Sequence, residues 1–224
     1  MKLKYHFLSG LILACGLGLS SCNDSFLERN PKDQLSDISF WKTEDDATKY
    51  ATGIYLYLIE PENHTIMTDC YTDNAIPVHV GAEQGVLSAG TAVSSNPHFL
   101  QLWQAAYETI RRCQIFYEHI GEVSMNEKAK AQLTAEVQFL EAFAYHNLWK
   151  YMGGVPILDH PLQLNEPLPA RSSADETYDY VVKLLDKAAP NLPEIRTAAD
   201  HGKASAGACY ALKARMAFYN HKYD

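Results

Sequence analysis

The segment from Glu127 to Gly154 reads EKAKAQLTAEVQFLEAFAYHNLWKYMGG, and it decides the fold class. Its apolar positions recur at the spacing of one helix face: Leu133, Val137, Leu140, Ala144 and Leu148. Ser124, three residues before Glu127, predicts a capping box at the start. Gly153 predicts the end near Tyr151, because glycine adopts the left-handed cap conformation without strain. We therefore expect a long helix over residues 124–151.

Four further segments show the same periodicity. They predict a helix that starts at Thr43 and helices over residues 97–120, 174–189 and 204–220. Start signals support three of them, because Asp46 follows Thr43, Pro97 follows Asn96, and Glu176 follows Ser173 at capping distances.

Neighbouring helices are expected to form two antiparallel pairs, 97–120 with 124–151 and 174–189 with 204–220. Small residues alternate with aromatic ones along them, as in tetratricopeptide units, although a strict 34-residue period is absent. The predicted fold class is all-α, built from tetratricopeptide-like antiparallel helix pairs with long irregular loop insertions. The last helix has no partner after it, so we expect a chain truncated before a C-terminal half.

Two insertions interrupt the helical pattern. Residues 60–96 contain glycines, prolines and serines that break every candidate period, and residues 157–172 contain three prolines. A loop as long as residues 60–96 in a compact domain is usually functional or disordered, and this one is too rich in isoleucine, valine and tyrosine to be simply disordered. The prolines predict a rigid loop over residues 157–172.

The composition excludes some classes of protein. The chain has 224 residues, 47% of them hydrophobic, and a formal charge of −8, with no basic bias of the kind that nucleic acid binding requires. No apolar run reaches the ~18–20 residues of a membrane-spanning helix, which excludes a channel or transporter formed by this chain alone.

The N-terminus is typical of a bacterial lipoprotein. Lys2 and Lys4 precede an apolar run over residues 7–19, and Leu19-Ser20-Ser21-Cys22 follows in the pattern of a lipobox. Acylation of Cys22 would anchor the chain stably, since two or more acyl chains hold where one does not. An ordinary cleaved signal with a chance cysteine is the alternative. The expected organisation is a signal peptide over 1–21, a lipidated tether and entry segment over 22–42, and a helical domain over 43–224.

The remaining cysteines argue against a zinc site or a disulfide framework. Cys70, Cys113 and Cys209 are odd in number and widely spaced. We expect Cys113 and Cys209 to be small buried hydrophobic residues.

Several motifs together resemble one family. They are FWKTEDDA from Phe40, the W-x₃-Y-x₂-I pattern of Trp103, Tyr107 and Ile110, FLEAFAY from Phe139 followed by GGVPI from Gly153, and GK at Gly202 before ALKAR at Ala211. In this order, after a lipobox, they resemble the SusD/RagB family of surface lipoproteins from Bacteroidetes, over nearly the whole chain from residue 22.

The resemblance implies a helical fold with tetratricopeptide-like pairs, a lipid anchor in the outer membrane, and a SusC-like TonB-dependent transporter as partner. It implies a glycan, sometimes a peptide, as cargo. The family usually has arginine where Glu141 stands and asparagine where Gln114 stands, so we expect helix-surface or packing roles for both. Family members also continue for more than as much chain again.

Candidate ligand contacts lie over residues 63–100, in the first insertion and just after it. The residue types fit a glycan, because sugars present C–H faces to aromatic rings and hydroxyls to amides and carboxylates. The candidates are Tyr71, Asp73, Asn74, His79, Asn96, His98 and Phe99. Alternatively, Asp73 and Asn74 only cap a turn. The tryptophans, Trp41, Trp103 and Trp149, fall in helical motifs and are expected in the core, which leaves no broad aromatic platform.

No catalytic motif is present, and we expect neither a cofactor nor a metal ion. Asp69 and Asp73 are four residues apart, a spacing at which paired carboxylates can do acid–base work, but no partner base accompanies them. His146 is expected in the core or at its boundary.

The predicted function is a non-enzymatic surface lipoprotein that binds nutrients and delivers them to the transporter. A helical-repeat envelope scaffold with protein partners only is the alternative, and a hydrolase is a third.

Overall fold

The structure is a computed structural model that describes residues 40–58, 68–75 and 83–223. The α-helices among these residues are α3 (Glu44–Leu58), α5 (Glu83–Ser88), α6 (Pro97–His119), α7 (Glu127–Met152), α8 (Ala174–Ala188) and α9 (Ala206–Tyr219). Short 3-10 helices, η2 (Thr68–Tyr71), η3 (Ile120–Glu122), η4 (Ala189–Asn191) and η5 (Ala198–Asp200), lie between them. The described part of the chain contains no β-strand, only an isolated bridge between Thr43 and Ser124.

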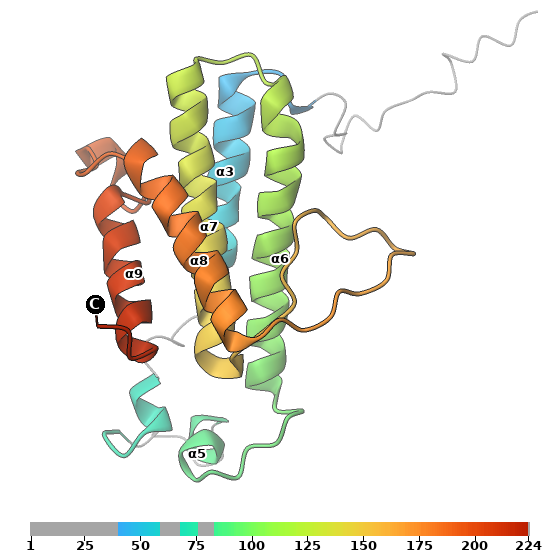
Figure 1. Cartoon of the computed structure of the whole chain (residues 1–224), viewed down its shortest axis with the longest axis vertical. Helices are drawn as coiled ribbons and strands as arrows, with labels where there is room; N and C mark the ends of the chain where they lie inside the picture. Colours follow the sequence, from blue (N-terminus) through green and yellow to red (C-terminus); the bar gives the residue numbers. More distant parts are fainter. Residues whose placement is uncertain (1–39, 59–67, 76–82, 224) are drawn as a thin grey trace, which may run out of the picture. The chain divides into compact units, whose positions relative to one another are not determined.

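Helix α7 lies at the centre of the bundle and packs against α3, α6, α8 and α9. Figure 1 shows the long helices side by side, with α6, α7, α8 and α9 running alternately up and down. The predicted antiparallel pairs are therefore confirmed, as α6 with α7 and α8 with α9. The all-α, tetratricopeptide-like fold class is confirmed as well.

Most predicted helix starts are confirmed at the level of single hydrogen bonds. Ser173 and Glu176 form the capping box of α8, and Asn96 caps α6 with Pro97 in the first turn. At α3, the Thr43 backbone N–H donates to the Asp46 carboxylate (2.9 Å), and the Asp46 N–H donates back to Thr43 Oγ1 (3.3 Å). Each pair satisfies backbone donors that the first turn of a helix leaves unpaired.

The predicted capping box at the start of α7 is wrong. The N-cap is Asn126, whose side chain accepts from the backbone N–H groups of Lys128 and Ala129, and the helix starts at Glu127. Asparagine caps as well as serine does, so Asn126, one residue before the helix, replaces Ser124 in that role. The end is as predicted, because Gly153 has φ 71°.

The core is made by the inward faces of α6, α7, α8 and α9. Ile110, Tyr145, Leu185 and Met216, one from each helix, are buried within a single cluster. Each large apolar side chain buried in this way contributes about 1.5–3 kcal/mol. The three cysteines Cys70, Cys113 and Cys209 are buried and free, which confirms the prediction for Cys113 and Cys209.

A long loop over residues 153–173 connects α7 to α8, and its two ends are tied together. The Ser172 N–H donates to the Val155 carbonyl (3.3 Å), and Arg171 donates to the carbonyls of Met152 and Gly154. A Cβ on Gly154 would stand 2.0 Å from the Ser172 carbonyl oxygen, so this crossing requires glycine. The loop therefore leaves the bundle and returns to it at a fixed point, as Figure 1 shows beside α6.

None of the helices that the structure describes combines the length and apolar character needed to cross a membrane.

Candidate ligand-binding site

Four of the residues predicted as ligand contacts come together at the start of α6. Tyr71, in η2, packs edge-on against His98 with 5.2 Å between ring centroids. His98 also packs against Phe99 and Tyr151. The Asn96 side chain is buried and accepts from the His98 N–H (2.9 Å), so it caps α6. The sequence thus identified residues that share one place in the fold, and at least Asn96 has a structural role there.

The other predicted contacts are more scattered. Asp73 and Asn74 are exposed, and the Asn74 N–H donates to Thr72 Oγ1 in a tight turn (3.2 Å). Asp69 is exposed, and its carbonyl accepts from the Thr72 N–H of the same turn. His79 and Cys22 lie outside the described residues.

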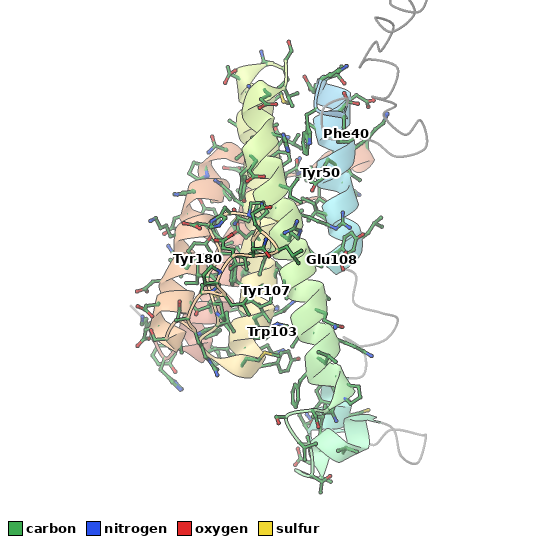
Figure 2. All side chains as sticks on the ribbon, turned by 90° about the vertical axis from the view of Figure 1, so that its right-hand side faces the viewer. Phe40, Tyr50, Trp103, Tyr107, Glu108 and Tyr180 are labelled. Atoms are coloured by element: carbon green, nitrogen blue, oxygen red, sulfur yellow. The ribbon has the colours of Figure 1, made fainter. Side chains whose placement is uncertain are left out.

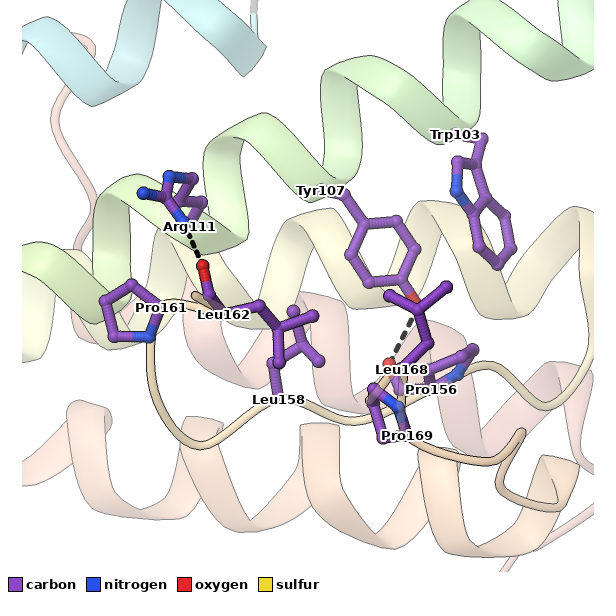
Figure 3. A pocket seen from close by; sticks show the side chains of 9 residues that line it. All are labelled: Trp103, Tyr107, Arg111, Pro156, Leu158, Pro161, Leu162, Leu168 and Pro169. Atoms are coloured by element: carbon purple, nitrogen blue, oxygen red, sulfur yellow. Dashed lines mark hydrogen bonds between the residues drawn. The ribbon is translucent and has the colours of Figure 1, made fainter. Parts of the chain in front are cut away.

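An apolar groove lies between α6 and the 153–173 loop, and sequence reasoning missed it. Its volume is about 410 Å³, and its lining residues are Trp103, Tyr107 and Arg111 from α6, with Pro156, Leu158, Pro161, Leu162, Leu168 and Pro169 from the loop. Figure 3 shows these side chains facing one another across the groove. Ligand sites in proteins typically have volumes of ~300–1,000 Å³ and largely apolar walls.

The expected core position of Trp103 is wrong. Its side chain is 37% exposed, and its ring lies 4.7 Å from that of Tyr107, with the planes inclined by 42°. The two residues are four apart, so they lie one helical turn apart on the same side of α6 (Figure 2). Helical spacing alone marked this side as apolar and could not say that no other helix covers it. Trp41 does lie in the core, as predicted.

Of the three long-range hydrogen bonds that hold the loop beside α6, two come from residues that line the groove. The Tyr107 hydroxyl donates to the Pro156 carbonyl (2.7 Å), and Arg111 Nη1 donates to the Leu162 carbonyl (2.9 Å), as drawn in Figure 3. Burial raises the pKa of Tyr107, so its hydroxyl keeps the proton that it donates. Leu168, on the loop side, remains 83% exposed. The groove is therefore a fixed surface that presents aromatic and aliphatic side chains to solvent.

A second, polar cavity lies further along α6. It has a volume of about 270 Å³ and is lined by Gln114, Tyr117, Gln138, Glu141, Asp159, Tyr180, Lys183, Leu184 and Lys187. Glu141, one of these lining residues, is fully buried. Its Oε1 accepts from Gln114 Nε2 (2.9 Å) and the Tyr180 hydroxyl (2.7 Å), and its Oε2 accepts from the Tyr117 hydroxyl (2.9 Å).

Burial raises the pKa of Glu141 to about 7, against the opposing effect of its hydrogen bonds from Tyr180, Tyr117 and Gln114. Desolvation disfavours the charged carboxylate, and the surrounding donors recover only part of that penalty. The two positions that depart from the resembled family, Gln114 and Glu141, are thus bonded to each other. The packing role expected for them is confirmed, and the helix-surface role is wrong.

The described residues hold no group of three or more histidine, cysteine, aspartate or glutamate side chains placed to bind a metal ion. His146 is buried on α7, as predicted, and burial lowers its pKa to about 4. His160, at the surface of the 153–173 loop, bridges Asp159 (2.6 Å) and Glu166 (2.7 Å), and the bonds to these carboxylates raise its pKa.

The helix pairs and the groove define the class, a tetratricopeptide-like helical protein with a ligand-sized hollow on its surface. A family model named SusD-like, described as "Starch-binding associating with outer membrane", matches residues 25–218. The chain belongs to this SusD-like family, which confirms the resemblance stated from its motifs.

Individual relatives agree with this assignment. The SusD-like protein P38 of Formosa agariphila is 28% identical over 231 residues, a match that covers 100% of this chain and 44% of the relative. The solved structure of a SusD-like protein from Bacteroides fragilis has a TM-score of 0.77 and 31% identity, and covers 87% of this chain. Surface glycan-binding protein A from Bacteroides thetaiotaomicron, solved with laminarihexaose, shares the fold, with a TM-score of 0.68, 21% identity and 80% of this chain covered.

The chain spans less than half the length of these relatives. It covers 44% of P38, 39% of the Bacteroides fragilis protein and 39% of the Bacteroides thetaiotaomicron protein.

Proposed function

We propose that this protein binds a glycan at the cell surface and passes it to a SusC-like TonB-dependent transporter in the outer membrane, without catalysing a reaction. Membership of the SusD-like family, whose model is described as starch-binding and associating with the outer membrane, supports the proposal. One relative of the same fold is a glycan-binding protein solved with an oligosaccharide.

The observation that carries the proposal is the exposed aromatic pair in the apolar groove. Aromatic rings have electron-rich faces, and the C–H groups on one side of a sugar ring pack against such faces. Trp103 is accessible to solvent, and the Tyr107 ring packs against it with 4.7 Å between the ring centroids. The two form a short stacking surface, which suits one or two sugar rings better than a long helical glycan.

The segment over residues 68–100 is proposed as a second contact region. The half-buried Tyr71, packed against the buried His98, forms its aromatic part, and the exposed Asp73 and Asn74 offer a carboxylate and an amide to sugar hydroxyls. His79 belongs to the same proposal.

Attachment to the membrane is proposed to occur through Cys22. The proposed organisation is a signal peptide over residues 1–21, a lipidated tether and entry segment over 22–42, and a helical domain over 43–224. A lipid anchor suits a chain of net charge −8, because an acidic surface does not hold a protein on anionic lipid.

The decisive experiment is glycan binding by the full chain, purified in detergent, on a glycan array followed by calorimetry. Trp103→Ala should weaken binding about 5–10-fold, because stacking on one aromatic ring contributes on the order of 1–1.5 kcal/mol. Tyr210→Ala is the matched control, since Tyr210 is also exposed, at 60%, and lies on α9 away from the groove lining.

Failure to bind any glycan would contradict the proposal and favour the scaffold alternative. Turnover of a bound glycan would instead establish a hydrolase. Delivery is tested separately by co-purification from solubilised membranes, in which a TonB-dependent barrel should be recovered. Incorporation of labelled palmitate that is lost in Cys22→Ser tests the anchor.

A further inference from the structure

One side of α6 carries two kinds of recognition chemistry in a row. Trp103, Tyr107 and Arg111 are spaced four residues apart, so they follow one another along the groove. At 1.5 Å of rise per residue, the row is about 12 Å long. Figure 3 shows the aromatic rings toward one end and the Arg111 guanidinium at the other.

Among the described residues, no carboxylate lies within 4.0 Å of the Arg111 guanidinium. The ion pairs found there are formed by lysines, histidines and arginines other than Arg111. Its neighbour Arg112, which is not in the groove, pairs with Glu108 at 3.2 Å. Arg111 is exposed and donates from Nη1 to the Leu162 carbonyl (2.9 Å). That single bond anchors the guanidinium and leaves further N–H groups for a ligand.

Among the residues that line the groove, Arg111 is the charged one, and the rest of the lining is apolar or aromatic. A fixed guanidinium prefers a planar carboxylate, to which it donates two parallel hydrogen bonds. The groove therefore suits a ligand that has a ring face at one end and a carboxylate at the other. The chain has 27 acidic and 19 basic residues, so a basic group without an acidic partner stands out against its surroundings.

We propose that the groove binds an acidic sugar unit, a hexuronic acid within an oligosaccharide. Its carboxylate pairs with Arg111, and a neighbouring ring face packs on Trp103 and Tyr107. This rests on the proposed glycan-binding function and specifies the chemical class of the cargo. A neutral sugar would offer Arg111 only hydroxyls, which form weaker hydrogen bonds than a charged carboxylate does.

The test compares oligouronates with their methyl esters, which keep the same backbone and lose the charge. The probes are oligomers of galacturonate, glucuronate and mannuronate, titrated into the full chain by calorimetry. At least one acid should bind about 10–100-fold more tightly than its ester, the range that hydrogen bonds to charged groups provide. Its affinity should fall as sodium chloride rises, while that of the ester should not.

Three variants assign the effect to Arg111. Arg111→Gln should abolish the preference for acid over ester. Arg111→Lys should keep part of it, because the charge remains while the planar pair of donors is lost. Arg215→Gln is the matched control, as an exposed arginine on α9 with the same loss of charge. Unfolding curves of each variant separate a loss of binding from a loss of fold.

The outcomes are distinguishable. Equal binding of acids and esters, or a preference that survives Arg111→Gln, overturns the uronate proposal and leaves glycan binding intact. Binding of neutral glycans alone overturns it in the same way. An acidic peptide that competes where no uronate binds would overturn the assigned ligand class. Absence of binding to every glycan contradicts the proposed function itself.

Discussion

The polar cavity and the apolar groove are both lined by residues of α6 and the 153–173 loop. They differ in whether their characteristic side chains are buried and bonded within the protein or exposed to solvent. In the polar cavity, Glu141 is fully buried and accepts three hydrogen bonds from the protein. In the apolar groove, Trp103 and Leu168 remain open to solvent. Leu158 belongs to both, because its side chain lines the groove and its carbonyl accepts from Gln114 (3.1 Å).

The difference separates stability from recognition. A buried polar group contributes to folding when its partners satisfy it, and the network around Glu141 has little capacity left for a ligand. An exposed aromatic pair contributes little to folding and remains available for binding. Variants of the polar cavity should therefore change stability, whereas variants of the groove should change binding.

Removing the buried carboxylate should have the largest effect. Glu141→Ala leaves Gln114, Tyr117 and Tyr180 without their shared acceptor in the interior. We expect the free energy of unfolding to fall by roughly 3–5 kcal/mol, as measured by urea denaturation, because unsatisfied buried donors pay their desolvation penalty in full.

Glu141→Gln is the control for that experiment, because it keeps the shape and an acceptor oxygen. It should lower the free energy of unfolding by only about 1 kcal/mol. If both variants lowered the free energy of unfolding by only about 1 kcal/mol, the hydrogen bonds around Glu141 would contribute little to stability. The proposed difference between the polar cavity and the groove would then be wrong.

The second effect is a pH dependence in which two buried groups oppose each other. Burial raises the pKa of Glu141 from 4.5 to about 7, so its contribution is complete below pH 4.5 and is lost as pH rises through about 7. Burial lowers the pKa of His146 from 6.5 to about 4, so its contribution is complete above pH 6.5 and is lost as pH falls through about 4.

Single substitutions should separate these two contributions. Between pH 4.5 and 6.5, Glu141→Gln should become more stable relative to wild type as pH rises, by on the order of 2–3 kcal/mol. His146→Gln should become less stable relative to wild type over the same interval by a similar amount. Urea midpoints across this pH range measure both, and parallel curves for wild type and Glu141→Gln would contradict the buried carboxyl's shift.

The third effect concerns the bond that holds the loop beside the groove. Tyr107→Phe removes the hydroxyl that donates to the Pro156 carbonyl and keeps the ring. We expect about 1 kcal/mol of lost stability, and faster amide hydrogen exchange in residues 156–169, because the loop loses one of its three long-range bonds to α6. Unchanged exchange in that segment would show that the remaining bonds from Arg111 and Gln114 fix the loop without Tyr107.

Local signals in the sequence predicted local structure well. The caps at Thr43, Asn96 and Ser173 and the glycine stop at Gly153 depend on residues a few positions apart, and all are confirmed. The predicted cap of α7 was wrong because Ser124 and Asn126 can both cap a helix. Which of the two does so depends on where the chain turns into the helix, and that residue is Asn126.

The groove could not be predicted, because it depends on contacts between distant segments. The bonds Tyr107–Pro156 and Arg111–Leu162 join residues 49 and 51 positions apart, and periodicity within α6 says nothing about them. The burial of Glu141 has the same origin, since its donors come from both α6 and α8. Helical spacing shows which side of a helix is apolar, but only the packed structure shows what covers that side.

The smallest effect on stability should come from substituting Leu168. This variant tests whether a groove residue affects binding while leaving stability nearly unchanged. This residue lines the groove and is 83% exposed, so Leu168→Ser should change the free energy of unfolding by about 0.5 kcal/mol or less. Glycan affinity should nevertheless fall several-fold, because the bound ring loses an apolar wall. Leu164→Ser is the control, since Leu164 is 99% exposed on the same loop but absent from the groove lining. Calorimetry that gave equal affinities for the two variants would show that the groove is not where the glycan lies.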